Sequence, residues 1–85
     1  MDALIRKPAE AAPLLRKVVE TAEGDHGRTE ARFYLAMACH RSGAGDEART
    51  LFRQASQWIA AHRPKDPGFR TLRAEAEAVL AGRGN

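Results

Sequence analysis

The stretch from Thr29 to Pro64 constrains the fold of this chain more than any other part of its sequence. Two segments in which apolar residues recur with helical spacing are separated there by a short turn, Ser-Gly-Ala-Gly, at residues 42–45. Such a pair of segments predicts an antiparallel helical hairpin. Alternation of apolar and polar residues with period two, which would favour strands, does not extend over a useful length of the sequence. The predicted fold class is therefore all-α.

Helical spacing predicts about four helices, at about residues 8–22, 28–41, 46–64 and 67–81. Pro13 lies within the first segment, so the first helix either begins near Pro13 or bends there. Gly24 and Gly27 bracket a polar link, and the second helix is expected to have Thr29 or Gly27 as its N-cap. Gly43 suits a left-handed residue after the end of that helix.

Length and composition predict one cytoplasmic domain spanning residues 1–85. The single cysteine, Cys39, excludes an internal disulfide and favours a reducing compartment. Residues 1–8 lack the apolar core of a signal peptide, and no stretch reaches the roughly 18 apolar residues of a membrane span. We therefore expect no membrane association.

The spacing of cysteine and histidine residues in the sequence indicates no catalytic or metal-binding site. Cys39 and His40 are adjacent, and neighbouring residues on a helix point about 100° apart, so Cys39 is expected to be a small core residue. His26, His40 and His62 do not have the close spacing of metal ligands. We therefore expect no catalytic residue, no cofactor, no metal site and no enzymatic activity.

An internal repeat links the first and third predicted helices. Residues 11–18 and residues 48–55 share the spacing of small, large apolar and polar side chains, at an offset of 37 residues. Each run is preceded by an acidic residue, Glu10 or Glu47. An offset of this size is typical of proteins built from helix–turn–helix repeats.

These residues resemble the tetratricopeptide repeat family. Leu35 and Ala36 stand where that family has Leu-Gly, and Ala48 and Phe52 match its Ala-x₃-Phe motif. Arg32 departs from the pattern, because the family has tryptophan there. The run at residues 9–16 is also similar to bacterial versions of these repeats.

The resemblance implies a right-handed superhelix fragment with three parts. These are a partial repeat at about residues 8–27, a full repeat at about 28–64 and a capping helix at about 67–81. It also implies a protein–protein interaction module, a small adaptor or scaffold without enzymatic activity, whose protein or peptide partner the sequence does not identify.

In this family the first helix of each repeat usually lines a concave groove that holds the partner. By resemblance, the candidate groove residues are Glu30, Phe33, Met37, His40 and Arg41. An alternative stays open for Phe33 and Met37, because the fourth helix could cover both as part of the core. Trp58 is expected to pack against the fourth helix rather than to anchor a ligand. The lysine and asparagine clamp that the family uses for carboxylate termini is missing from this face.

The first helix is expected to have an uncovered apolar face. Repeats bury their faces against neighbours, and residues 1–7 are too short to supply a preceding partner helix. The candidate self-association edge is formed by Leu14, Leu15, Val18 and Val19. We expect a second copy of the chain or another protein to cover this edge.

A second function remains open, that of a small basic helical protein that binds nucleic acid. The net charge is +3, and acidic and basic residues alternate along the chain, which favours solvated helix faces over a nucleic-acid footprint. The arginines that could nevertheless gather on one edge are Arg49, Arg53, Arg63, Arg70 and Arg73.

Overall fold

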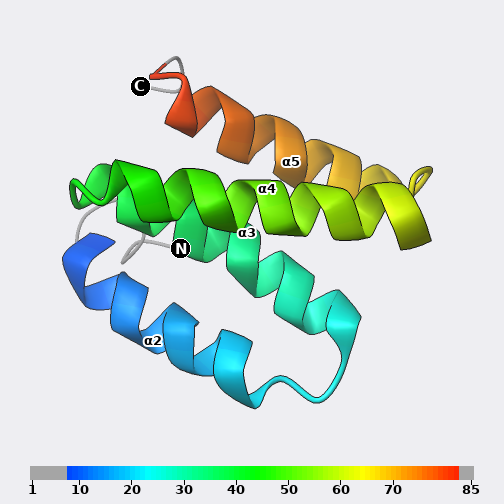
Figure 1. The fold of residues 1–85 in the computed structure, drawn as a ribbon, viewed down its shortest axis with the longest axis horizontal. Coiled ribbons are helices and arrows are strands. Elements are labelled where there is room, and N and C mark those ends of the chain that lie inside the picture. The colour runs from blue at the N-terminus through cyan, green and yellow to red at the C-terminus, as the bar shows by residue number, and fades with distance from the viewer. Residues whose placement is uncertain (1–7, 83–85) are drawn as a thin grey trace.

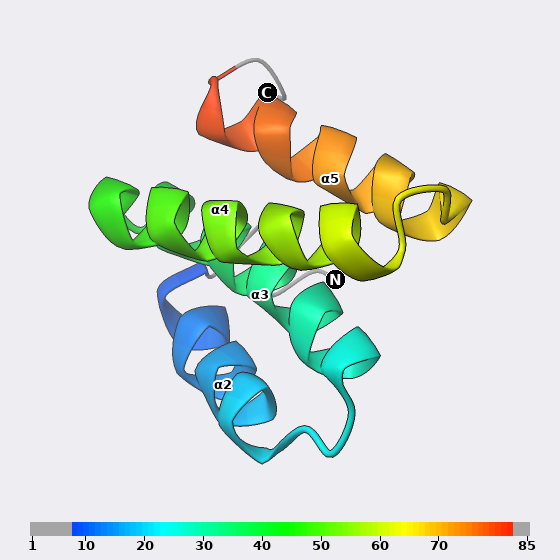
Figure 2. The same ribbon diagram turned by 45° about the vertical axis from the view of Figure 1, so that its right-hand side comes forward.

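Four α-helices make up the described part of the chain, residues 8–82 of a computed structural model. They are α2 (Pro8–Thr21), α3 (Asp25–Arg41), α4 (Gly45–His62) and α5 (Pro67–Leu80). α2 and α5 lie on opposite sides of the pair formed by α3 and α4 (Figures 1 and 2). No strand occurs within this range, and the all-α prediction is confirmed. The expectation about residues 1–7 falls outside the described residues.

α3 is the central helix and packs against each of the other three. This arrangement explains why its sequence is apolar on two sides, because a helix with neighbours on two sides needs two apolar faces. Its buried residues extend around most of the helix and are Thr29, Ala31, Phe33, Leu35, Ala36, Met37, Ala38 and Cys39. Glu30 and Arg41 stay exposed and mark the narrow arc that no helix covers.

α3 and α4 approach closely through small side chains. Ala36 on α3 and Ala48 and Ala55 on α4 are all completely buried. Alanine at these positions lets the two helices pack with little separation, so that larger neighbours fill the space beside them. The rings of Phe33 and Phe52 meet edge to face across this contact, with their centroids 5.8 Å apart.

Enlarging one of these alanines should force the hairpin apart. We expect Ala55→Leu to lower the free energy of unfolding by about 1–3 kcal/mol, because the added carbons meet a fully packed interior. Ala61→Leu is the matched control, since Ala61 is an exposed residue of the same helix, and it should change stability by less than about 0.5 kcal/mol. Urea unfolding followed by circular dichroism measures both. Equal effects for the two variants would contradict a tight contact at Ala55.

The turn between α3 and α4 depends on Gly43, which has a φ of 94°. The Gly43 N–H donates to the His40 carbonyl at 3.2 Å, and the Ala44 N–H donates to the Cys39 carbonyl at 2.7 Å. These two bonds form a Schellman motif, which satisfies carbonyls at the end of the helix. The left-handed residue predicted at Gly43 is confirmed, and the backbone there favours glycine because other residues rarely adopt a positive φ.

The start of α3 differs from the sequence prediction. α3 begins at Asp25 with Gly24 as its N-cap, so the expected cap at Gly27 or Thr29 is wrong. Thr29 is instead buried within the helix. The Asp25 carboxylate lies in the first turn, where the positive end of the helix dipole stabilises negative charge.

Arg28 holds the corner between α2 and α3. Its guanidinium donates to the Val19 carbonyl at 3.3 Å and to the Ala22 carbonyl at 2.9 Å, and it forms an ion pair with Asp25 at 2.9 Å. The arginine therefore satisfies carbonyls at the C-terminal end of α2, where a cation is favoured. These bonds reach across the chain link, so helical spacing alone does not reveal them.

Pro13 lies inside α2 rather than at its start. α2 begins at Pro8 and continues through Pro13, so the alternative in which the helix begins near Pro13 is wrong. Pro13 is exposed, and its missing N–H removes one backbone bond from this helix.

α5 is fixed at its start by a cap and by aromatic contacts of Phe69. The Asp66 carboxylate accepts a hydrogen bond from the Phe69 N–H at 3.1 Å, and Pro67 occupies the first turn. The Phe69 ring meets Trp58 of α4 at 5.8 Å. The predicted packing of Trp58 against the fourth helix is confirmed.

Candidate partner-binding site

A hollow of about 130 Å³ lies between α3 and α5. Its lining comes from the N-terminal half of α3 and the start of α5, and consists of His26, Glu30, Tyr34, Asp66, Gly68, Phe69 and Leu72. Because α3 and α5 are held on the same central core, the hollow has walls from two separate helices.

The α3 wall is built from one helical face. His26, Glu30 and Tyr34 are spaced four residues apart, which places their side chains in one row. The His26 ring lies against the Phe69 ring of α5, with centroids 4.6 Å apart. Phe69 and Leu72 are buried, so they give the hollow an apolar floor beneath a polar row.

Tyr34 carries the most distinctive chemistry of the hollow. Partial burial raises the pKa of its phenol, and the carboxylates of Glu30 and Glu75 raise that pKa further. The phenol therefore keeps its proton at neutral pH and is available as a hydrogen-bond donor. Among residues 8–82 its hydroxyl has no hydrogen-bond partner. A half-buried aromatic ring with a free polar tip suits a contact with a partner.

Only one of the five predicted groove residues lines this hollow. Glu30 does, whereas Phe33 and Met37 are 0% and 4% exposed and belong to the core. Both side chains are therefore core residues, although Phe33 packs on Phe52 of α4, the third helix, and not on the fourth helix that the core alternative named. His40 is half-buried and Arg41 is exposed towards the C-terminal end of α3, outside the lining of the hollow. Whether either binds a partner stays a prediction.

Sequence reasoning missed Tyr34 and His26 as groove residues. Tyr34 shares an apolar stripe of the helix with Ala31, Leu35 and Ala38, and such a stripe favours burial over a binding surface. The helical spacing of four residues from Glu30 was the signal that places Tyr34 on the exposed arc.

The predicted self-association edge divides into an inner and an outer pair. Leu15 and Val19 pack against the core, while Leu14 and Val18 are 68% and 47% exposed. The repeat offset explains this exposure, since Val18 of α2 corresponds to Ala55 of α4, which α3 buries completely. Within the described chain no helix covers Val18 in the way that α3 covers Ala55.

Cys39 lies in the core, as the sequence predicts. Burial raises the pKa of its thiol, and the nearby Glu47 carboxylate raises it further, while Arg16 lowers it. The thiolate, which is the reactive form of cysteine, is therefore disfavoured at neutral pH.

The Cys39 thiol should report on opening of the core. We expect the native protein to react with Ellman's reagent more than about a hundredfold more slowly than the urea-unfolded chain at the same pH. Because the folded-state pKa is raised, the unfolded chain releases its thiol proton first, so stability should decline as pH rises above about 8.5. The Cys39→Ala variant should show a weaker decline. Rapid labelling of the native protein would contradict the burial of this thiol.

The described residues contain neither a cluster suited to bind a metal ion nor a membrane-spanning helix. No cluster of three or more histidine, cysteine, aspartate or glutamate side chains suited to hold a metal ion occurs between residues 8 and 82. In the same range no helix has both the length and the apolar character that crossing a bilayer requires.

The architecture defines a helical repeat protein, in which successive helices pack on one another at a regular offset. The sequence model of the tetratricopeptide repeat matches residues 6–76, so the chain belongs to the tetratricopeptide repeat family. Comparisons with curated proteins and with solved structures gave no significant match.

Proposed function

We propose that this chain is a non-enzymatic adaptor or scaffold of the cytoplasm that holds a segment of a partner protein in the hollow between α3 and α5. Membership of the tetratricopeptide repeat family supports protein–protein interaction as the general activity. The observation that carries the particular site is the Tyr34 phenol in its lining, which lacks a hydrogen-bond partner in the described chain and whose pKa is raised by burial and by two carboxylates.

The hollow favours a partner segment with a lysine or arginine side chain. Glu30 from α3 and Glu75 from α5 both act on the Tyr34 phenol, so a cation placed there meets negative charge from two helices. The Tyr34 ring adds a face on which a cation is attracted, and its hydroxyl donates to a backbone carbonyl of the segment. Phe69 and Leu72 supply the apolar surface beneath.

Selection of random peptides displayed on phage tests this proposal. Peptides recovered on the wild-type protein should carry lysine or arginine, and Tyr34→Ala should weaken their binding by at least about tenfold, as expected for a central aromatic contact. Tyr34→Phe removes only the hydroxyl, and Glu30→Gln removes only the charge. The two variants therefore measure the contribution of each group to peptide binding separately. The matched control is Gln54→Ala, an exposed residue of α4 outside the hollow.

The affinities are measured by fluorescence anisotropy on variants whose unfolding curves match that of the wild type. Peptides that bind Tyr34→Ala and Gln54→Ala as tightly as the wild type would show that the hollow is not the binding site. Recovery of only acidic peptides would contradict the proposed cationic partner.

A second copy of the chain is the partner that we propose for the outer edge of α2. Leu14 and Val18 are one helical turn apart and form an apolar ridge in contact with solvent. In a two-fold arrangement the same ridge on both copies packs against itself, which removes four large side chains from water.

Sedimentation velocity at micromolar concentration tests self-association. We expect the wild type to sediment as a dimer and the Leu14→Glu/Val18→Glu double variant as a monomer, because carboxylates are costly to bury without a partner. Gln57→Glu, at an exposed position of α4, is the control and should remain dimeric. A wild-type protein that is monomeric and cooperatively folded in this range would contradict the proposal.

A further inference from the structure

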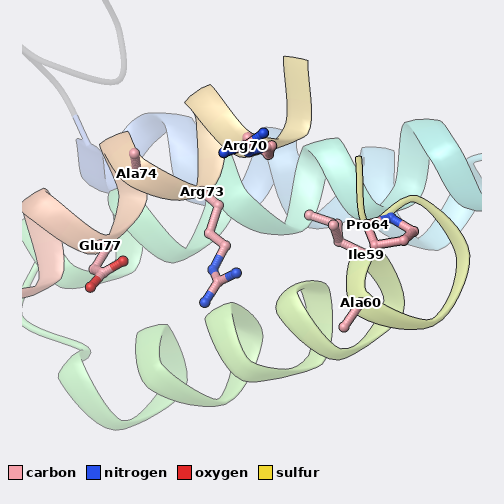
Figure 3. A pocket seen from close by; sticks show the side chains of 7 residues that line it. All are labelled: Ile59, Ala60, Pro64, Arg70, Arg73, Ala74 and Glu77. Carbon is pink, nitrogen blue, oxygen red and sulfur yellow. The ribbon is translucent and has the colours of Figure 1, made fainter. Parts of the chain in front are cut away.

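A second and larger pocket, of about 350 Å³, lies between α4 and α5, outside the hollow described above. Its lining residues are Ile59, Ala60, Pro64, Arg70, Arg73, Ala74 and Glu77. Figure 3 shows the side chains of Arg73 and Glu77 extending from α5 towards the space above α4. The pocket thus combines an apolar floor with charged groups on one wall.

The arginines of this pocket are not neutralised within the described chain. Neither Arg70 nor Arg73 takes part in an ion pair among residues 8–82. The adjoining face of α4 carries Arg53, seven residues before Ala60, and Arg63 is the C-cap residue just beyond the helix. Arg49 lies on the same face, although Asp46 pairs with it. Two of the five arginines singled out in the sequence, Arg70 and Arg73, thus line this pocket without an ion-pair partner among residues 8–82.

The repeat offset of 37 residues shows which face of α3 is equivalent to the α5 wall of this pocket. Leu35 and Leu72 are 37 residues apart and both buried, so the offset that relates α2 to α4 also relates α3 to α5. The same offset pairs three exposed residues of α5 with three buried residues of the α3 face that meets α4. The pairs are Arg70 with Phe33, Arg73 with Ala36 and Ala74 with Met37. The surface of α5 therefore has the position of a helix-binding face.

Its chemistry differs from that of the equivalent face of α3. Phe33 and Ala36 correspond to the exposed arginines Arg70 and Arg73, and Met37 corresponds to the smaller and exposed Ala74. A helix that packs here needs small or apolar residues opposite Ala74 and Ile59, and carboxylates opposite Arg70 and Arg73.

We propose that the α4–α5 pocket binds an acidic amphipathic helix of a partner protein. Apolar side chains of that helix rest on Ile59, Ala60 and Ala74, and its carboxylates pair with the free guanidinium groups. The apolar floor favours such a helix over nucleic acid at the same place, because it offers the backbone of a nucleic acid no hydrogen bond. This site acts independently of the α3–α5 hollow.

A synthetic peptide supplies the probe for this proposal. It is a fluorescein-labelled helix of about 18 residues, long enough to follow α4, with a stripe of leucine and alanine flanked by glutamates. A second peptide has lysine in place of every glutamate, and a DNA duplex of similar length is the third probe. Binding is measured by fluorescence anisotropy at low and at physiological salt, because long-range charge attraction weakens as salt increases.

The acidic peptide should bind the wild type, and the lysine peptide should not. Arg73→Glu should weaken binding by at least about tenfold, because it replaces a partner charge with a repelling one. Lys17→Glu makes the same change in net charge on exposed α2 and should alter binding by less than about twofold. Ala74→Tyr fills the pocket without changing charge, and it should also weaken binding by at least about tenfold.

Several results would overturn the proposal. These are failure of the acidic peptide to bind the wild type, equal losses for Arg73→Glu and Lys17→Glu, and unchanged affinity in Ala74→Tyr. Binding of the DNA duplex that exceeds binding of the acidic peptide would assign the arginines to nucleic acid instead. Tyr34→Ala, which alters the other site, should leave acidic-peptide binding unchanged, so the two proposals succeed or fail separately.

Discussion

The close contact between α3 and α4 is the interaction on which the rest of the structure depends. Three buried alanines, Ala36, Ala48 and Ala55, allow the two helices to pack tightly, and the Phe33 and Phe52 rings fill the remaining space. α3 then has two further faces available, one for α2 and one for α5. Both pockets exist because α5 is held against α3 on one side and α4 on the other.

Much of this arrangement follows from local sequence signals. Four helices, the left-handed residue at Gly43 and the contact of Trp58 with α5 are all predicted by periodicity and turn chemistry. The N-terminal boundary of α3 is not, because Arg28 stabilises it through carbonyls that only the folded chain brings near. A helix boundary that depends on such tertiary hydrogen bonds cannot be predicted from the local sequence pattern.

The position of the candidate site was only partly predictable, for a reason that lies in α3. A helix that is apolar on two sides offers no single stripe from which to infer its solvent-facing arc. Phe33 and Met37 are therefore ambiguous in the sequence, and the structure buries both in the core. Tyr34 emerged as a site residue only when α5 supplied the second wall of the hollow, with Glu75 near enough to raise the pKa of the phenol.

The corner at Arg28 has a consequence for how the molecule opens. One guanidinium joins the Val19 and Ala22 carbonyls to the first turn of α3, so that the end of α2 does not unwind without disturbing Asp25 and the residues after it. We therefore expect amide protons on both sides of the link to exchange with solvent in a common opening event. α2 thus shares the stability of α3 at this corner. Its solvent-facing ridge, Leu14 and Val18, stays free to contact another surface.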